Sequence, residues 1–241
     1  MSLRKSVLTG VSAIALSLGM ACVAQADVVL PVTNLVFNTF TGTFTPPKTL
    51  FTTAAPTNWT IGTTTGLLSN LIGVGNQGSE DSSAGVYAVY NNPYSVTVPA
   101  GTNFYQADGN PQFESTITQT VPGLTANTVY DISFQQASGQ QQGFTGATTE
   151  QWKVFLGLGG ISTTCAPSSD CTINGLSNNV EVDSSVMVTP STGFVNFNLQ
   201  NLAFPAIPAA DLTGGSAVLT FLAWGNNGSD VNEPPTVFLE A

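Results

Sequence analysis

The sequence predicts an all-β protein built as an antiparallel β-sandwich, and three observations carry this prediction. No window after Ala26 repeats apolar residues at helical spacing for long enough to form an amphipathic helix. Glycine (24 residues) and proline (14 residues) interrupt every long window. Short runs rich in Val, Ile, Thr, Tyr and Phe alternate with turn-forming clusters. Since single all-β domains of about 200–250 residues are common, we expect one sandwich domain over residues 27–241.

The strands are predicted in order along the chain. The first segments are 28–40, 86–90 and 94–98. The segment 113–121 places Phe113, Ser115, Ile117, Gln119 and Val121 on one face, which indicates a strand covered on one side. A turn at Pro122-Gly123 leads into the strand 128–134. Later candidates are 151–156, 180–188, 193–199, 217–224 and 236–239.

Three segments are predicted as loops because polar and turn-forming residues dominate them. They are 41–56, 62–83 and the Gln- and Gly-rich stretch 135–149. Long loops in compact domains often carry function.

The N-terminal 26 residues have the pattern of a secretory signal peptide. Arg4 and Lys5 precede an apolar stretch over residues 7–20, and Ala24-Gln25-Ala26 forms a small-x-small cleavage site before Asp27. A membrane anchor is the rival interpretation, but the apolar run is shorter and more interrupted than a spanning helix of about 20 residues. A lipid-modified Cys22 is a second rival. We therefore expect a secreted protein, extracellular or at the cell surface, with no membrane insertion after cleavage.

The charge balance excludes several function classes. Four Lys and Arg residues stand against 14 Asp and Glu, with no His, for a net charge of −10. Removal of residues 1–26 takes two of the basic residues and none of the acidic ones, which leaves −12 and only Lys48 and Lys153 as cations. Without an imidazole, Ser-His-Asp and Cys-His centres are excluded. The negative charge disfavours nucleic acids and anionic membranes as partners.

Two cysteines remain after cleavage, Cys165 and Cys171. Since Pro, Ser and Asp stand between them in a chain with an export signal, we predict a disulfide that closes a surface loop. Two thiols without His or further Cys would leave a metal coordination sphere half empty.

Several motifs resemble exported bacterial proteins with a galactose-binding-like, carbohydrate-module-like jelly roll, including many with a C-terminal PEP-CTERM sorting signal. They are NFYQADGNP (103–111), STITQTVPGLT (115–125), TVYDISF (128–134), TTEQWKV (148–154), LTFLAWG (219–225) and PPTVFL (234–239). The resemblance implies a jelly-roll fold and carbohydrate association. The sorting tail is absent from this sequence.

The same resemblance implies a structural calcium ion, but only one of its two acidic ligand positions is matched in this sequence. In related jelly rolls, one acidic ligand follows the first strand and another lies in the last strand. Glu240 matches the second position, but residues 37–41 hold no carboxylate. Calcium requires about six to eight oxygen ligands. The sequence therefore predicts no cofactor beyond this half-supported calcium and no other metal site.

Two polar-aromatic groups are the candidate carbohydrate-binding residues. Trp224 ends an apolar strand and is followed by Asn226, Asn227 and Asp230, so an indole face lies next to amide and carboxylate groups. The alternative for these residues is a plain turn after a core strand. The second group, again on a strand that runs into a turn, consists of Tyr105, Gln106, Asp108 and Asn110. Trp152 alternates with Val154 and Leu156 and is predicted to lie in the core.

Paired carboxylates could hydrolyse glycosidic bonds, but adjacent acids are usually solvated loop charges. The available acids are Glu80-Asp81, Glu114, Glu150 and Glu181 with Asp183. We predict no catalytic residue and expect a protein that is not an enzyme. The expected function is binding of, or association with, extracellular polysaccharide. The alternative is a structural matrix or adhesin subunit that associates with copies of itself through exposed strand edges.

Overall fold

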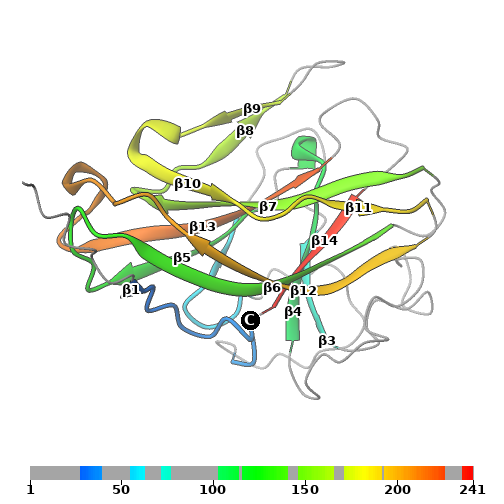
Figure 1. Cartoon of the computed structure of the whole chain (residues 1–241), viewed down its shortest axis with the longest axis horizontal. Coiled ribbons are helices and arrows are strands. Elements are labelled where there is room, and N and C mark those ends of the chain that lie inside the picture. The colour runs from blue at the N-terminus through cyan, green and yellow to red at the C-terminus, as the bar shows by residue number, and fades with distance from the viewer. Residues whose placement is uncertain are drawn as a thin grey trace, which may run out of the picture.

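A computed structural model of the chain describes residues 28–39, 55–62, 72–76, 103–113, 116–140, 146–165, 171–191, 193–225 and 235–240. These residues form two facing β-sheets and one additional hairpin (Figure 1). Every strand pairing is antiparallel except the two-residue contact of β1 with β6. The regular secondary structure of the described part consists only of strands and short 3₁₀ helices, which confirms the predicted all-β antiparallel sandwich.

The two sheets are named here after their central strands. The β6 sheet contains β1 (Val28–Val29), β3 (Ile72–Asn76), β4 (Asn103–Asp108), β6 (Tyr130–Gln140), β12 (Phe194–Ala203) and β14 (Pro235–Glu240). The β7 sheet contains β2 (Thr60–Ile61), β5 (Thr116–Pro122), β7 (Thr148–Gly157), β10 (Asn179–Asp183), β11 (Met187–Thr189) and β13 (Ser216–Gly225). The hairpin consists of β8 (Ser162–Thr164) and β9 (Thr172–Asn174). The 3₁₀ turns are η2 (Pro111–Phe113), η3 (Leu176–Asn178) and η4 (Ala209–Asp211).

The strand order is that of a jelly roll. The β6 sheet runs β4-β14-β6-β12, and the β7 sheet runs β5-β13-β7-β10. The chain changes sheet at each step from β4 to β7, and again from β12 through β14. A jelly roll is a double sheet of eight such strands arranged as two Greek keys. The described strands therefore have the topology that the resemblance implied.

The core between the sheets is aromatic at its centre. Phe134 of the β6 sheet meets Phe221 of the β7 sheet edge to face, with ring centroids 5.1 Å apart. Trp152 is fully buried against Phe221 and Tyr105, and its Nε1 donates a hydrogen bond of 3.1 Å to the carbonyl oxygen of Phe238. The predicted core role of Trp152 is confirmed, and the pairing of these rings holds the two sheets together.

One end of the same interior is polar. Along β6, the inward positions change from Tyr130, Ile132 and Phe134 to Gln136, Ser138 and Gln140, all buried. Ser184 Oγ donates to Gln136 Oε1 at 2.6 Å, and Gln136 Nε2 donates to the Ser185 carbonyl at 2.8 Å. Since each polar group finds a partner on the facing elements, the strand continues without apolar alternation.

This polar end corrects the prediction of a loop over 135–149. β6 continues to Gln140 and β7 begins at Thr148, and residues 141–145 lie outside the described part. The prediction missed the strand because it expected apolar side chains at every buried position.

Other strand predictions are corrected in detail. The segment 28–40 forms only the short β1, because Asn34 and Phe37 have positive φ angles (54° and 50°) that end an extended strand. The segment 180–188 is divided between β10 and β11, and β3 lies within the predicted loop 62–83. Phe113 belongs to η2, whereas Ile117, Gln119 and Val121 share the buried face of β5 as predicted. The predicted strands 86–90 and 94–98 lie outside the described residues.

The cysteine prediction is confirmed. Cys165 and Cys171 form a disulfide that closes the connection between β8 and β9. Among the described residues, no helix is long and apolar enough to cross a lipid bilayer. The predicted signal peptide lies outside them.

Candidate functional site

The outward face of the β7 sheet carries the candidate site, named here the Trp224 face. It consists of Thr149, Gln151 and Lys153 on β7, Trp224 on β13, Glu181 and Asp183 on β10, and Val186. Alternation along β7 sends Glu150, Trp152 and Val154 inward and the residues between them outward. Alternate residues of β7 therefore contribute to the core and to the candidate site.

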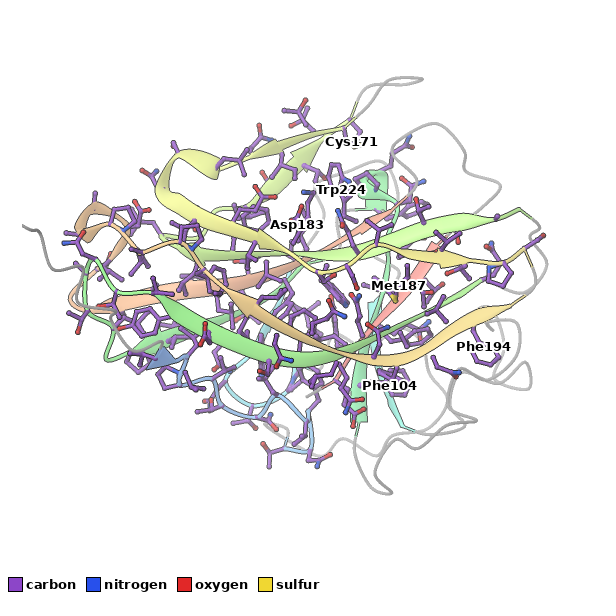
Figure 2. All side chains as sticks on the ribbon, in the orientation of Figure 1. Phe104, Cys171, Asp183, Met187, Phe194 and Trp224 are labelled. Atoms are coloured by element: carbon purple, nitrogen blue, oxygen red, sulfur yellow. A yellow bond between two sulfur atoms is a disulfide. The ribbon has the colours of Figure 1, made fainter. Side chains whose placement is uncertain are left out.

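The register of three strands brings these side chains together. On one side of β7, Trp224 of β13 lies opposite Gln151. On the other side of β7, Asp183 of β10 lies opposite Lys153. Glu181 lies opposite Phe155, two positions along the same face. Figure 2 shows Trp224 and Asp183 on the side of the sandwich where the hairpin with Cys171 projects, and Phe104 on the opposite side.

Trp224 is half-buried because it lies at the rim of a second apolar cluster. This cluster contains Phe155, Ile161 and Leu222, and Ile173 of the hairpin packs against it together with Trp224. The contact fixes the indole on one side, while the rest of the ring faces a pocket. A rigid, partly exposed indole is a suitable surface for stacking on an apolar ring face.

Lys153 is held in place by two carboxylates and an aromatic ring. Its Nζ lies 2.9 Å from Glu181 Oε1 and 2.9 Å from Asp183 Oδ2, and 5.7 Å from the centroid of the Trp224 ring. Burial alone would lower the pKa of Lys153, but the hydrogen bonds and charges of Asp183 and Glu181 outweigh it and raise the pKa. The ammonium is therefore charged and already paired.

A pocket of about 190 Å³ lies beside Trp224. It is lined by Thr149, Glu150, Gln151, Val186, Trp224 and Gly225. Its volume is below the roughly 300–1,000 Å³ of pockets that enclose a drug-sized ligand. It therefore suits contact with one unit of a chain better than enclosure of a whole ligand.

Glu150 belongs to the interior although it contributes to this lining. The residue is fully buried, Thr189 Oγ1 donates to its Oε2 at 2.6 Å, and Thr148 Oγ1 donates to its Oε1. Burial raises its pKa to about 7, against the lowering effect of the hydrogen bonds from Thr148, Thr189 and Ser138. Its carboxyl group is thus a structural partner of neighbouring hydroxyls between the sheets.

The second predicted group of carbohydrate-binding residues lies in a different environment. Tyr105 is fully buried, its hydroxyl donates to the Thr116 carbonyl at 3.2 Å, and its pKa is raised by burial. Asp108 and Asn110 are also buried, and Gln106 is half-buried on the other sheet, paired with Phe238. The structure therefore separates this group from Trp224 and places the Tyr105 ring where a sugar in solution cannot stack on it.

Asp108 and Asn110 form a tight turn after β4. Asp108 Oδ1 accepts the backbone N–H of Asn110 at 2.7 Å. Within the described part of the chain, Asp108 Oδ2 and Asn110 Nδ2 have no hydrogen-bond partner. Burial, together with the nearby charge of Glu150, raises the pKa of Asp108 to about 8, although the Asn110 N–H lowers it.

The remaining predicted residues divide between those placed and those not described. Asn226, Asn227 and Asp230 lie outside the described residues, as do Glu80, Asp81 and Glu114. Among the carboxylates considered for catalysis, Glu181 and Asp183 are both engaged with Lys153. Sequence reasoning named Glu181 with Asp183 as a carboxylate pair and Lys153 only as one of two cations, and it missed their grouping. The i, i+2 spacing of Glu181 and Asp183 on a strand was the available signal.

Glu240, the predicted half of a calcium site, is buried at the end of β14. In the ranges that the structure describes, no three Asp, Glu or Cys side chains gather closely enough to hold a metal ion. Since calcium needs about six to eight oxygens, including charged ones, the described residues around Glu240 do not fit the ion, and no role is assigned to it.

The sequence matches no family model and no curated protein. Several solved structures are similar at low identity. The enzymatically active domain of tailspike protein 4 from bacteriophage CBA120 is 12% identical, with a TM-score of 0.39 over 76% of this chain and 18% of that one. An apo cyclase from Fischerella sp. is 14% identical, with a TM-score of 0.43 over 88% and 93%.

A third similar structure is the family 11 carbohydrate-binding module from Clostridium thermocellum in complex with a mixed-linked tetrasaccharide. It is 8% identical, with a TM-score of 0.32 over 76% of this chain and 86% of that one. This chain spans 18% of the length of the tailspike domain.

Proposed function

We propose that this protein is an exported, non-enzymatic jelly roll that binds extracellular polysaccharide at the Trp224 face. The observation that carries the proposal is a half-buried indole, fixed by an apolar cluster, at the side of a pocket lined by Thr149 and Gln151. Indoles stack on the apolar faces of sugar rings, and hydroxyl and amide groups exchange hydrogen bonds with sugar hydroxyls. The disulfide supports an oxidising compartment as the place of folding.

The proposal assigns binding without catalysis. Glycoside hydrolysis uses two carboxyl groups that flank the scissile bond, one of them an acid with a raised pKa. On the Trp224 face, Glu181 and Asp183 both hold Lys153. Glu150 and Asp108, the carboxyl groups with raised pKa values, are buried in the interior. Incubation of the protein with soluble glycans, followed by a reducing-end assay, tests this assignment, and release of new reducing ends would contradict it.

The binding experiment uses the chain from Asp27 to Ala241, folded under oxidising conditions, and measures depletion by a panel of insoluble and soluble glycans. Trp224→Ala is expected to weaken retention at least about tenfold, because loss of a central aromatic anchor typically costs about 2 kcal/mol or more. Gln151→Ala is expected to weaken it without disturbing the apolar cluster. Leu199→Ala, which truncates a side chain 61% exposed on the β6 sheet, is the matched control and should bind like the wild type.

Absence of retention by every glycan would overturn the proposal. The alternative from the sequence, a self-associating matrix subunit, then becomes the better hypothesis. Size-exclusion chromatography over a wide concentration range tests it, because pairing at exposed strand edges gives assembly that increases with concentration. A monomer at all concentrations would contradict the alternative as well.

A further inference from the structure

Lys153 is the only Lys or Arg among the described residues, and it lies at the centre of the Trp224 face. A cation next to an aromatic platform is usually expected to attract anionic ligands. Here two carboxylates, each 2.9 Å from Nζ, already compensate that charge. The three side chains together carry one net negative charge.

The strand register holds the two carboxylates next to the Lys153 ammonium group. Lys153, Glu181 and Asp183 come from two hydrogen-bonded strands, with Lys153 directly opposite Asp183. The Lys153 side chain is only 15% exposed, against 34% for Glu181 and 41% for Asp183. An arriving ligand therefore meets the carboxylates more readily than the ammonium. Moving both carboxylates away would leave a poorly solvated and unpaired cation, which is costly.

From this arrangement we infer that the Trp224 face selects uncharged polysaccharides and rejects acidic ones, with Glu181 and Asp183 as the residues that determine specificity. The inference rests on the proposed function and adds the class of ligand. A uronate or sulfate group near Trp224 would meet net negative charge on the site and on the whole molecule. A neutral sugar chain meets an indole, Thr149 and Gln151 without electrostatic cost.

The test compares retention by neutral glycans, such as cellulose and mixed-linkage glucan, with retention by polygalacturonate, alginate and chondroitin sulfate at low salt. The wild type is expected to bind at least one neutral glycan and none of the acidic ones. Glu181→Gln with Asp183→Asn removes both compensating charges and frees Lys153. This double variant is expected to gain at least about tenfold in affinity for acidic glycans, and the gain should disappear at high salt.

Two controls separate the site from general charge effects. Adding Lys153→Met to the double variant should abolish the gained binding of acidic glycans. If the gain came only from the smaller net negative charge of the double variant, most of it would remain without Lys153. Asp131→Asn removes one carboxylate from β6, in the other sheet, and should leave the preference unchanged. Melting curves show whether each variant is folded.

The outcomes distinguish this inference from the proposed function. If the wild type binds acidic glycans as well as neutral ones, or if the double variant gains nothing while folded, the selection by Glu181 and Asp183 is wrong and polysaccharide binding stands. If the wild type binds no glycan, the proposed function fails and this inference fails with it.

Discussion

Two carboxyl groups in the interior of this protein have unusually high pKa values. Burial raises both pKa values, and the neighbouring groups that modify this effect differ between the two. Glu150 lies among hydroxyls that donate to it, and these bonds moderate the effect of burial, so its pKa reaches about 7. Asp108 Oδ1 accepts one hydrogen bond, from the backbone N–H of Asn110, which lowers the pKa of Asp108. Burial and the negative charge of Glu150 raise this pKa to about 8. Both groups therefore retain protons at a pH where ordinary carboxyl groups have lost them.

This arrangement predicts that stability falls as pH rises. Both folded-state pKa values lie above the ordinary values, 3.8 for Asp108 and 4.5 for Glu150, so the folded protein binds more protons than the unfolded chain between these limits. The stabilisation from these two groups is complete when the pH is below the ordinary pKa values. It decreases as the pH rises above them, and it is lost once the pH has passed the folded-state pKa values of about 7 for Glu150 and about 8 for Asp108. Each group can contribute up to about 1.4 kcal/mol per pH unit.

Thermal melting from about pH 6 to about pH 9 measures the effect. We expect the melting temperature of the wild type to decrease over this range, and Asp108→Asn, which cannot ionise, to show a smaller decrease. A wild-type melting temperature that stays constant or rises would contradict the assignment of raised pKa values.

At the level of elements, the β8–β9 hairpin is a cover over the outward side of the β7 sheet. Ile161 and Ile173 pack on Phe155 and Leu222, and Thr163 Oγ1 donates to the Pro111 carbonyl at 2.8 Å. The disulfide joins cysteines six positions apart, and a loop of that size contributes about 2 kcal/mol in the chain-entropy view. Trp224 depends on this cover because it packs against the same cluster.

We expect Cys165→Ala with Cys171→Ala to loosen the hairpin locally and leave the sandwich folded. Hydrogen–deuterium exchange should become faster over residues 162–174, because a short hairpin alone is only marginally stable, while exchange in β6 and β13 stays slow. The addition of a reductant to the wild type should reproduce the change. Faster exchange throughout both sheets would show that the disulfide supports the whole fold instead.

Sequence patterns predicted strands well where one face is apolar and poorly where the interior is polar. β13 and β14 appear close to their predicted bounds because their apolar alternation is strong. The second half of β6 was missed, since Gln136, Ser138 and Gln140 resemble a loop until their partners on facing strands are known. For the candidate site, Trp224 as a binding residue stays a prediction from the sequence, whereas the pairing of Lys153 with Asp183 depends on strand register, which sequence patterns do not predict.

The whole molecule combines a strongly negative charge with very few cations. The net charge is −10 for the full sequence, and the only ion pairs among the described residues are those of Lys153 with Glu181 and Asp183. Repulsion between unpaired carboxylates destabilises the compact state more than the extended one. Salt bridges contribute little to offset it.

Added salt is therefore expected to stabilise this protein. Raising sodium chloride from about 10 mM to about 150 mM shortens the screening length severalfold and weakens the repulsion. The melting temperature at pH 7 should rise. A fall would mean that the ion pairs around Lys153 outweigh the repulsion, and the variant Glu181→Gln with Asp183→Asn would then no longer show this fall.

The position of the last strand has a consequence for how the molecule is made. β14 lies between β4 and β6 and pairs with both, so the centre of one sheet is filled by the final described residues of the chain. β14 is synthesised after all the other described strands, and it pairs with β4 from more than a hundred positions further along the chain. Folding of such a topology is slow, because long loops close before their contacts form. The β6 sheet therefore cannot be completed until β14 has been synthesised, and β4 and β6 lack their shared neighbour until then.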